Sequence, residues 1–188
     1  ARSNGASGIG LYRSEFPFII RDSFPGEEEQ YRIYRKIVDA YPDGPVRLRT
    51  ADIGGDKLVG VDAEVERNPF LGVRGIRFSL ANPALFRQQL RAMLRAGYER
   101  SIGIMFPMVS SVEEMEEARA AVTECQDALK LDGIPYAHEP AIGAMIELPS
   151  AVEALDELAD HCDFFSIGTN DLVMYLLGVD RTNDRLSE

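Results

Sequence analysis

The chain has 188 residues, a formal net charge of −11 at pH 7 and 45% hydrophobic residues. That apolar content is ordinary for a globular protein, whereas the negative charge argues against a general nucleic-acid or anionic-membrane surface. No apolar run approaches membrane-spanning length, and no secretory signal is recognisable. Two cysteines without a CxxC motif indicate a reducing compartment, so we expect a cytoplasmic protein.

A short apolar strand, a polar loop and an amphipathic helix recur along the chain. Strands appear as short apolar runs, and helices as apolar positions at helical spacing. In chain order we predict a strand at 8–12, a helix after Gly26, a strand at 46–50, a long acidic loop at 58–68, a short helix at 70–80, a helix starting at Asn82 and Pro83, a strand at 102–106, a helix from Ser111 to about Lys130, a strand at 142–146, a helix from Ser150 to about His161, a strand at 164–167 and a final helical turn.

Local motifs predict three of the helix starts. Asn82 stands before a proline, as an N-cap stands before the first helical position. Ser111 and Ser150 are each followed three residues later by a glutamate, which matches the capping box. The run of strand and helix units favours one α/β domain with a parallel sheet over residues 1–188. The predicted sheet forms one of two architectures. One is a TIM-type (β/α)8 barrel, which would be incomplete here because such a barrel needs roughly 250 residues. The other is an open, doubly wound sheet.

Polar side chains follow the predicted strands where they end. They are Arg13 after the first strand, Arg49 in the second, Glu147 after the fourth, Asn170 and Asp171 after the fifth, and Arg181 one short helix later. The C-terminal ends of parallel strands share one face, and α/β folds build their active sites there. We therefore expect these side chains to converge on one site.

Each of these residues also has a simpler interpretation. The alternatives are an ion pair of Arg13 with Glu15 or with a neighbouring helix, an ion pair of Arg49 with Asp52 or Asp56, a helix N-cap at Asn170 or Asp171, and a helix-end charge at Arg181. Neither His138 nor His161 is placed to act as a proton relay. Cys125 and Cys162 fit small buried hydrophobes.

The candidate site residues suit a metal and a phosphate. Glu147 lies between Ile146 and Leu148, so it is expected to be buried, and a buried carboxylate needs a partner or a metal. Carboxylate oxygens on neighbouring strand ends suit Mg²⁺, which takes one or two carboxylates together with substrate oxygens. Arginines beside them suit phosphate oxygens, which guanidinium groups bind in bidentate fashion. A small phosphorylated substrate that also carries a carboxylate fits both groups.

Six motifs that occur in order carry a resemblance to a known family. They are GIGLYRSEF at 8–16, RTADIGGDK at 49–57, NPFLGVRGIR at 68–77, MFPM at 105–108, IELP at 146–149 and SIGTND at 166–171. Over nearly its whole length the chain resembles the C-terminal phosphoenolpyruvate-binding barrel of the Enzyme I family, the phosphoenolpyruvate-protein phosphotransferases of the bacterial sugar phosphotransferase system. Pyruvate phosphate dikinase and phosphoenolpyruvate synthase share related motifs.

The resemblance implies a TIM barrel that binds phosphoenolpyruvate and Mg²⁺. Residue by residue, it implies that Glu147 and Asp171 hold Mg²⁺, that Arg13 and Arg49 hold the phosphoryl group as catalytic residues, and that Arg74, Asn170, Asp171 and Arg181 are further substrate contacts. The phosphoryl group would pass to a histidine on another domain of the same parent chain and then to a small histidine phosphocarrier protein. The parent is expected to be a homodimer.

The chain departs from the family pattern at Met174, where glutamine is usual, and at Val73, where tryptophan is frequent. The segment corresponds to strands two to six of the barrel, and no cysteine matches the one that protonates the substrate in the family. We therefore expect this chain to carry most of the substrate and metal ligands but not to turn over by itself. Two other functions remain open: a metal-dependent lyase or aldolase of the phosphoenolpyruvate/pyruvate barrel class, and a non-catalytic regulatory module that binds phosphoenolpyruvate.

Overall fold

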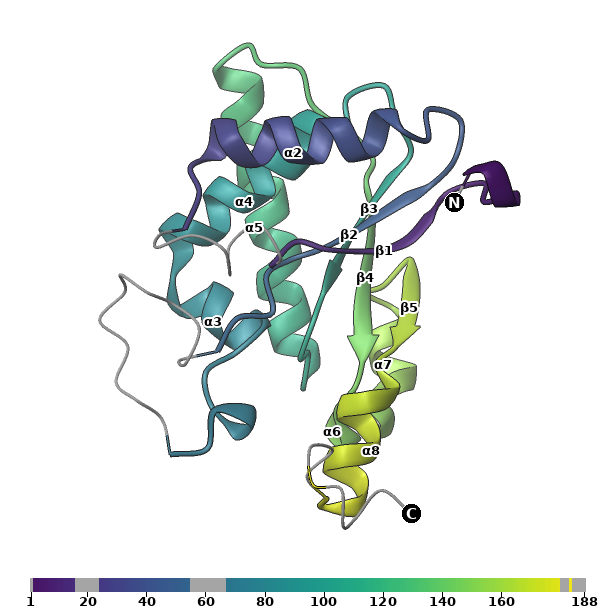
Figure 1. Ribbon diagram of the computed structural model, residues 1–188. Helices are drawn as coiled ribbons and strands as arrows, with labels where there is room; N and C mark the ends of the chain where they lie inside the picture. The colour runs from purple at the N-terminus through teal and green to yellow at the C-terminus, as the bar shows by residue number, and fades with distance from the viewer. Residues whose placement is uncertain (1, 16–23, 55–66, 180–182, 184–188) are drawn as a thin grey trace.

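The computed structural model of the chain describes residues 2–15, 24–54, 67–179 and 183 (Figure 1). Each predicted strand is present and differs from its prediction by at most one residue at either end. The strands are β1 (Ile9–Arg13), β2 (Val46–Arg49), β3 (Ile102–Phe106), β4 (Ala141–Ile146) and β5 (Phe164–Ile167). Short apolar runs bounded by polar loops therefore identified the sheet correctly.

All neighbouring strands are parallel, and they follow the order β1-β2-β3-β4-β5. A doubly wound sheet reverses its strand order at a switch point, and the described strands show no reversal, so that alternative does not fit. The fold is α/β, with the sheet curled into a half-barrel (Figure 1). Successive parallel strands of this kind place every C-terminal strand end on the same rim.

Helices precede, connect and follow the strands. They are η1 (Arg2–Asn4), α2 (Glu27–Asp39), η2 (Pro69–Leu71), α3 (Ile76–Ala81), α4 (Pro83–Ala96), α5 (Val112–Leu131), α6 (Pro149–Glu153), α7 (Leu155–Ala159) and α8 (Thr169–Leu177). Helices α2, α4 and α5 lie together on one side of the sheet (Figure 1), where α4 packs against both α2 and α5. No helix within the described ranges has the length and hydropathy needed to cross a lipid bilayer.

The core lies between the sheet and these helices. Leu48 of β2 and Ile104 of β3 are fully buried there, together with Leu90 of α4. Side chains of a strand alternate between its two faces, so Arg47 and Arg49, which flank Leu48, point to the concave face. The same alternation that builds the core thus supplies the opposite face with charge.

The predicted helix at 70–80 is wrong in its first half. Pro69–Leu71 forms a 3₁₀ turn, and α3 starts only at Ile76. Gly75 between them has φ of +61°, a left-handed conformation that interrupts a right-handed helix and that glycine adopts without strain. The break matters because it aims Arg74, the residue before Gly75, out of a helix and into the site described below. The predicted loop at 58–68 lies outside the described residues except for Arg67 and Asn68.

The predicted helix from Ser150 is also wrong at its start and in its middle. The N-cap residue is Leu148, with Pro149 at the first helical position, and the helix breaks at Ala154 into α6 and α7. Ser111 does cap α5, since its side chain accepts a hydrogen bond from the Glu114 amide. Asn82 precedes α4 as predicted, but its side chain donates to the Phe78 carbonyl at the end of α3 and caps nothing in α4.

We predict that Leu48→Ala lowers the free energy of unfolding by about 2–5 kcal/mol, because it leaves a cavity under the sheet. Leu131→Ala at the end of α5 is the matched control. Leu48 is 0% exposed and Leu131 is 88% exposed, so the control should change stability by less than about 0.5 kcal/mol. Urea unfolding followed by circular dichroism measures both, and equal losses would contradict this assignment of the core.

Candidate active site

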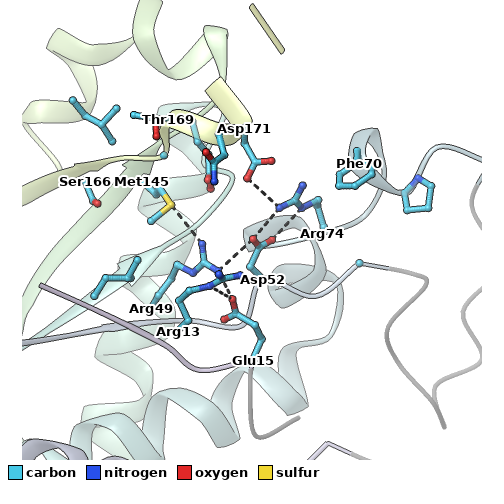
Figure 2. Close-up of a pocket in the computed structure, with 17 residues that line it drawn as sticks. Arg13, Glu15, Arg49, Asp52, Phe70, Arg74, Met145, Ser166, Thr169 and Asp171 are labelled. Carbon is cyan, nitrogen blue, oxygen red and sulfur yellow. Dashed lines mark hydrogen bonds and ion pairs between the residues drawn. The ribbon is translucent and has the colours of Figure 1, made fainter. Parts of the chain in front are cut away.

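A cavity of about 390 Å³ opens at the C-terminal ends of the strands (Figure 2). Most of its lining comes from β1, β2, the segments after β2, the ends of β4 and β5, and the start of α8. The lining residues are Leu11, Arg13, Glu15, Arg49, Asp52, Gly54, Pro69, Phe70, Arg74, Met145, Glu147, Ser166, Ile167, Gly168, Thr169, Asn170 and Asp171.

Strand register brings the lining residues together. Arg13 of β1 stands directly beside Arg49 of β2. Ile146 pairs with Ile167, so Glu147 and Gly168 follow their strands side by side. A Cβ atom at Gly168 would lie 2.6 Å from both Cβ and Oε2 of Glu147. Glycine at 168 therefore leaves the space that the Glu147 side chain occupies.

Glu15 joins the two arginines at the strand ends. Its Oε1 accepts a 2.8 Å hydrogen bond from Nε of Arg13 and a second hydrogen bond from Nη2 of Arg49. Glu15 and Arg49 are buried, whereas half of the Arg13 side chain is exposed at the rim. Arg49 also donates from Nη1 to the Met145 sulfur at 3.5 Å. The Arg49 guanidinium is thus fixed from both sides.

Asp52 continues the row of charges (Figure 2). Arg74 binds it in bidentate fashion, through Nε to Oδ1 at 3.0 Å and Nη2 to Oδ2 at 2.8 Å. Arg49 lies 3.5 Å from the same Oδ2, and Arg74 reaches Oδ2 of Asp171 at 3.4 Å. Burial opposes the charge on Arg74, but its bonds to Asp52 and the charges of Asp52 and Asp171 outweigh burial, so the pKa of Arg74 is raised. Cations and carboxylates alternate from Arg13 to Asp171.

Glu147 lines this cavity and is 1% exposed. Its Oε1 accepts a 2.7 Å hydrogen bond from the amide of Met108, whose φ is +61°. Burial raises the pKa of Glu147 from its ordinary value of 4.5 to about 7, and the nearby negative charges of Asp52 and Asp171 add to this effect. A cation bound beside Glu147 would lower this pKa again.

Three buried polar atoms around the cavity have no hydrogen-bond partner among the described residues. They are Oε2 of Glu15, Nε of Arg49 and Nη1 of Arg74. An unsatisfied buried polar group costs about 1–3 kcal/mol, and three beside one cavity are unusual for a purely structural network. A ligand with several acceptor oxygens would let the two guanidinium groups complete their bonds after a small rearrangement.

Six of the seven predicted site residues line this cavity. They are Arg13, Arg49, Arg74, Glu147, Asn170 and Asp171. The seventh, Arg181, lies outside the described residues. The alternative ion pairs of Arg13 with Glu15 and of Arg49 with Asp52 are confirmed as well, while Asp56 also lies outside the described residues. The alternative of an N-cap at Asn170 or Asp171 is wrong, because Gly168 occupies the N-cap position of α8.

The sequence predicts Glu15 and Asp52 only as ion-pair partners of Arg13 and Arg49, yet both carboxylates are buried members of the site. One sequence signal could have identified both as site residues: Glu15 comes two residues after Arg13, and Asp52 comes three residues after Arg49, each at a strand end. The two histidines are elsewhere: the His138 ring lies tilted against the Tyr136 ring, and His161 lies near Glu116. Cys125 is buried in the core as predicted, and the partly buried Cys162 packs against the same core.

Residues 1–188 match the profile of a family described as "PEP-utilising enzyme, PEP-binding domain". The chain belongs to this family. It is 46% identical over 185 residues to the phosphoenolpyruvate-protein phosphotransferase of Staphylococcus epidermidis, 47% identical to that of Staphylococcus carnosus and 46% identical to that of Mycoplasma capricolum. In each case the match covers 98% of this chain and 32% of the relative.

The chain therefore spans about a third of the length of these relatives. Its charged residues lie at the C-terminal ends of the parallel strands, where the strand pattern predicts that they converge. Among solved structures, a citrate lyase of Burkholderia xenovorans aligns over 92% of this chain and 51% of that chain, with 16% identity and a TM-score of 0.48. That likeness is too low to support an argument about fold or function.

The raised pKa of Glu147 predicts a loss of stability with rising pH in metal-free buffer. The folded state holds the proton up to about pH 7, whereas the unfolded chain releases it near 4.5, so stability falls across that window by on the order of 3 kcal/mol. Glu147→Gln removes this contribution. Urea unfolding at pH 5 and pH 8 should show a smaller drop for Glu147→Gln than for the unsubstituted chain, and parallel pH profiles would contradict the shift.

Proposed function

We propose that this domain binds phosphoenolpyruvate as part of a phosphoenolpyruvate-protein phosphotransferase. The observation that supports this most is one cavity that joins a row of three arginines to two carboxylates at its other end. The phosphoryl group would pass to a histidine on another domain of a longer parent chain and then to a small histidine phosphocarrier protein. The parent would be a cytoplasmic homodimer whose complete TIM barrel includes strands beyond β1–β5.

The arginines are suited to the phosphoryl group. Phosphoryl transfer needs charge neutralisation and in-line positioning more than covalent chemistry. Arg13 and Arg49 stand side by side from neighbouring strands, and Arg74 follows through Asp52. Guanidinium groups in such a row would hold the phosphoryl oxygens in place while charge develops on them. Asn170, which lines the same cavity, and Arg181 would be further contacts to the substrate.

Glu147 and Asp171 would hold a Mg²⁺ ion. The fit rests on charge and donor type: Glu147 is a buried carboxylate whose pKa is raised by burial and by Asp52 and Asp171, and a cation would relieve that repulsion. Among the described residues, no three histidine, cysteine or acidic side chains form a complete metal site, so substrate oxygens or water would complete the shell, as Mg²⁺ commonly requires. When bound, the metal would act as a Lewis acid on substrate oxygens.

The competing functions are less well supported. A lyase or aldolase acting on an unphosphorylated acid has no use for several arginines in one row, whereas a phosphate does. A regulatory module would be favoured if methionine at 174, where the family usually has glutamine, removed a polar contact from the site. Met174 is a buried residue of α8 that does not line the cavity. Methionine in place of the family's usual glutamine therefore leaves the arginine row and Glu147 intact.

We predict that phosphoenolpyruvate binding requires both Mg²⁺ and Arg49. Isothermal titration calorimetry should show binding with Mg²⁺ and little binding with EDTA, because Glu147 and Asp171 repel the trianionic ligand when no cation separates them. Arg49→Met should weaken affinity by about tenfold or more, through lost charge-assisted hydrogen bonds.

The matched control for that substitution is Arg87→Met. Arg87 is exposed on α4 and does not line the cavity. The Arg87→Met variant should therefore bind phosphoenolpyruvate with the same affinity as the unsubstituted chain. Failure of the unsubstituted chain to bind phosphoenolpyruvate at millimolar concentration with Mg²⁺ would contradict the proposed function.

A further inference from the structure

Glu15 occupies an unusual position among the charged residues of the cavity. One of its oxygens, Oε1, accepts from Arg13 at the end of β1 and from Arg49 at the end of β2. Its other oxygen has no described partner, and the residue is only 3% exposed. Asp52 repeats the arrangement one step along, since its carboxylate faces both Arg49 and Arg74.

Two arginines that stand in register on neighbouring strands repel each other when nothing lies between them. Their long side chains also have many rotamers, which a ligand must restrict when it binds. A carboxylate that accepts from both guanidinium groups removes the repulsion and restricts the rotamers before the ligand arrives. Preorganisation of this kind favours binding because the ordering cost is met in the unbound protein.

We propose that Glu15 is a positioning residue that holds Arg13 and Arg49 together as one phosphate-binding pair, with Asp52 doing the same for Arg49 and Arg74. This inference rests on the proposed function, because the pair it forms is the pair that would hold the phosphoryl group. Glu15 would not itself touch the reacting atoms. The Glu15 carboxylate would lie close to the anionic ligand and would repel it. The affinity gained by holding Arg13 and Arg49 in place would outweigh this repulsion.

The opposite interpretation makes an opposite prediction. If Glu15 were only a counter-charge that competes with phosphate for the arginines, its removal would free both guanidinium groups, and phosphoenolpyruvate would bind more tightly. If Glu15 positions the arginines, removal of its charge leaves the two guanidinium groups less firmly held and repelling each other, and phosphoenolpyruvate binds more weakly. The sign of the change in affinity therefore separates the two roles.

The test compares Glu15→Gln with the unsubstituted chain in two measurements. Calorimetric titration with phosphoenolpyruvate and Mg²⁺ should show affinity reduced by about tenfold. NMR of the arginine Nε–H groups, recorded without ligand, should show restricted guanidinium rotation for Arg13 and Arg49 in the unsubstituted chain and faster rotation in Glu15→Gln. The second measurement depends on no ligand, so it tests the positioning role even if the chain binds no phosphoenolpyruvate.

Glu27→Gln is the matched control. Glu27 also bridges two arginines, Arg91 and Arg95, at 2.7 Å each, but between α2 and α4 and away from the cavity. The Glu27→Gln substitution should leave the affinity for phosphoenolpyruvate and the NMR signals of Arg13 and Arg49 unchanged. If Glu15→Gln does not fold, Glu15→Asp replaces it, because aspartate keeps the charge but is one methylene too short to reach both guanidinium groups.

The outcomes distinguish the two claims. Weaker binding and faster guanidinium rotation in the Glu15 variant support the positioning role. Unchanged or tighter binding, or rotation that does not change, overturns it while the proposed function stands. Failure of the unsubstituted chain to bind phosphoenolpyruvate overturns the proposed function, and the rotation of Arg13 and Arg49 then decides the positioning role alone.

Discussion

Burial of charge is the constraint on which the site depends. Arg49, Asp52, Arg74 and Asp171 are all nearly inaccessible to solvent, and an ion taken out of water is costly unless an opposite charge and hydrogen bonds replace the solvent. The chain meets this requirement by alternating cations with carboxylates, from β1 across β2 to α8. Removal of one member would leave its neighbours buried without a counter-charge, so the row behaves as a unit.

The parallel sheet makes this alternation possible. Arg13 and Arg49 become neighbours only because β1 and β2 run in the same direction and in register, and Glu147 meets Gly168 for the same reason. Leu48, one residue before Arg49, is fully buried on the opposite face of β2. Packing under the sheet therefore holds the position of the arginine above it, and the stability of the core and the geometry of the site are linked through single strands.

The strands and most candidate residues were predictable from the sequence, because short apolar runs ending in charge are local signals. Arg13 and Glu147 follow such runs directly, Arg49 lies near the end of one, and Asp171 comes four residues after another. Arg74 could not be placed this way, since its position depends on the break at Gly75 and the pairing with Asp52. The division of α6 from α7 and the burial of Glu15 likewise depend on tertiary contacts, which a periodic pattern does not contain.

The central claim is that the arginine row and the pair Glu147 and Asp171 form one site for a phosphorylated ligand and a divalent cation. Anomalous diffraction from crystals of the chain grown with Mn²⁺ and phosphoenolpyruvate tests it most directly, because Mn²⁺ accepts the oxygen ligands that suit Mg²⁺. The account predicts an anomalous peak between Glu147 and Asp171, with the phosphate against Arg13 and Arg49. A peak elsewhere on the chain, or phosphate density away from these arginines, would contradict it.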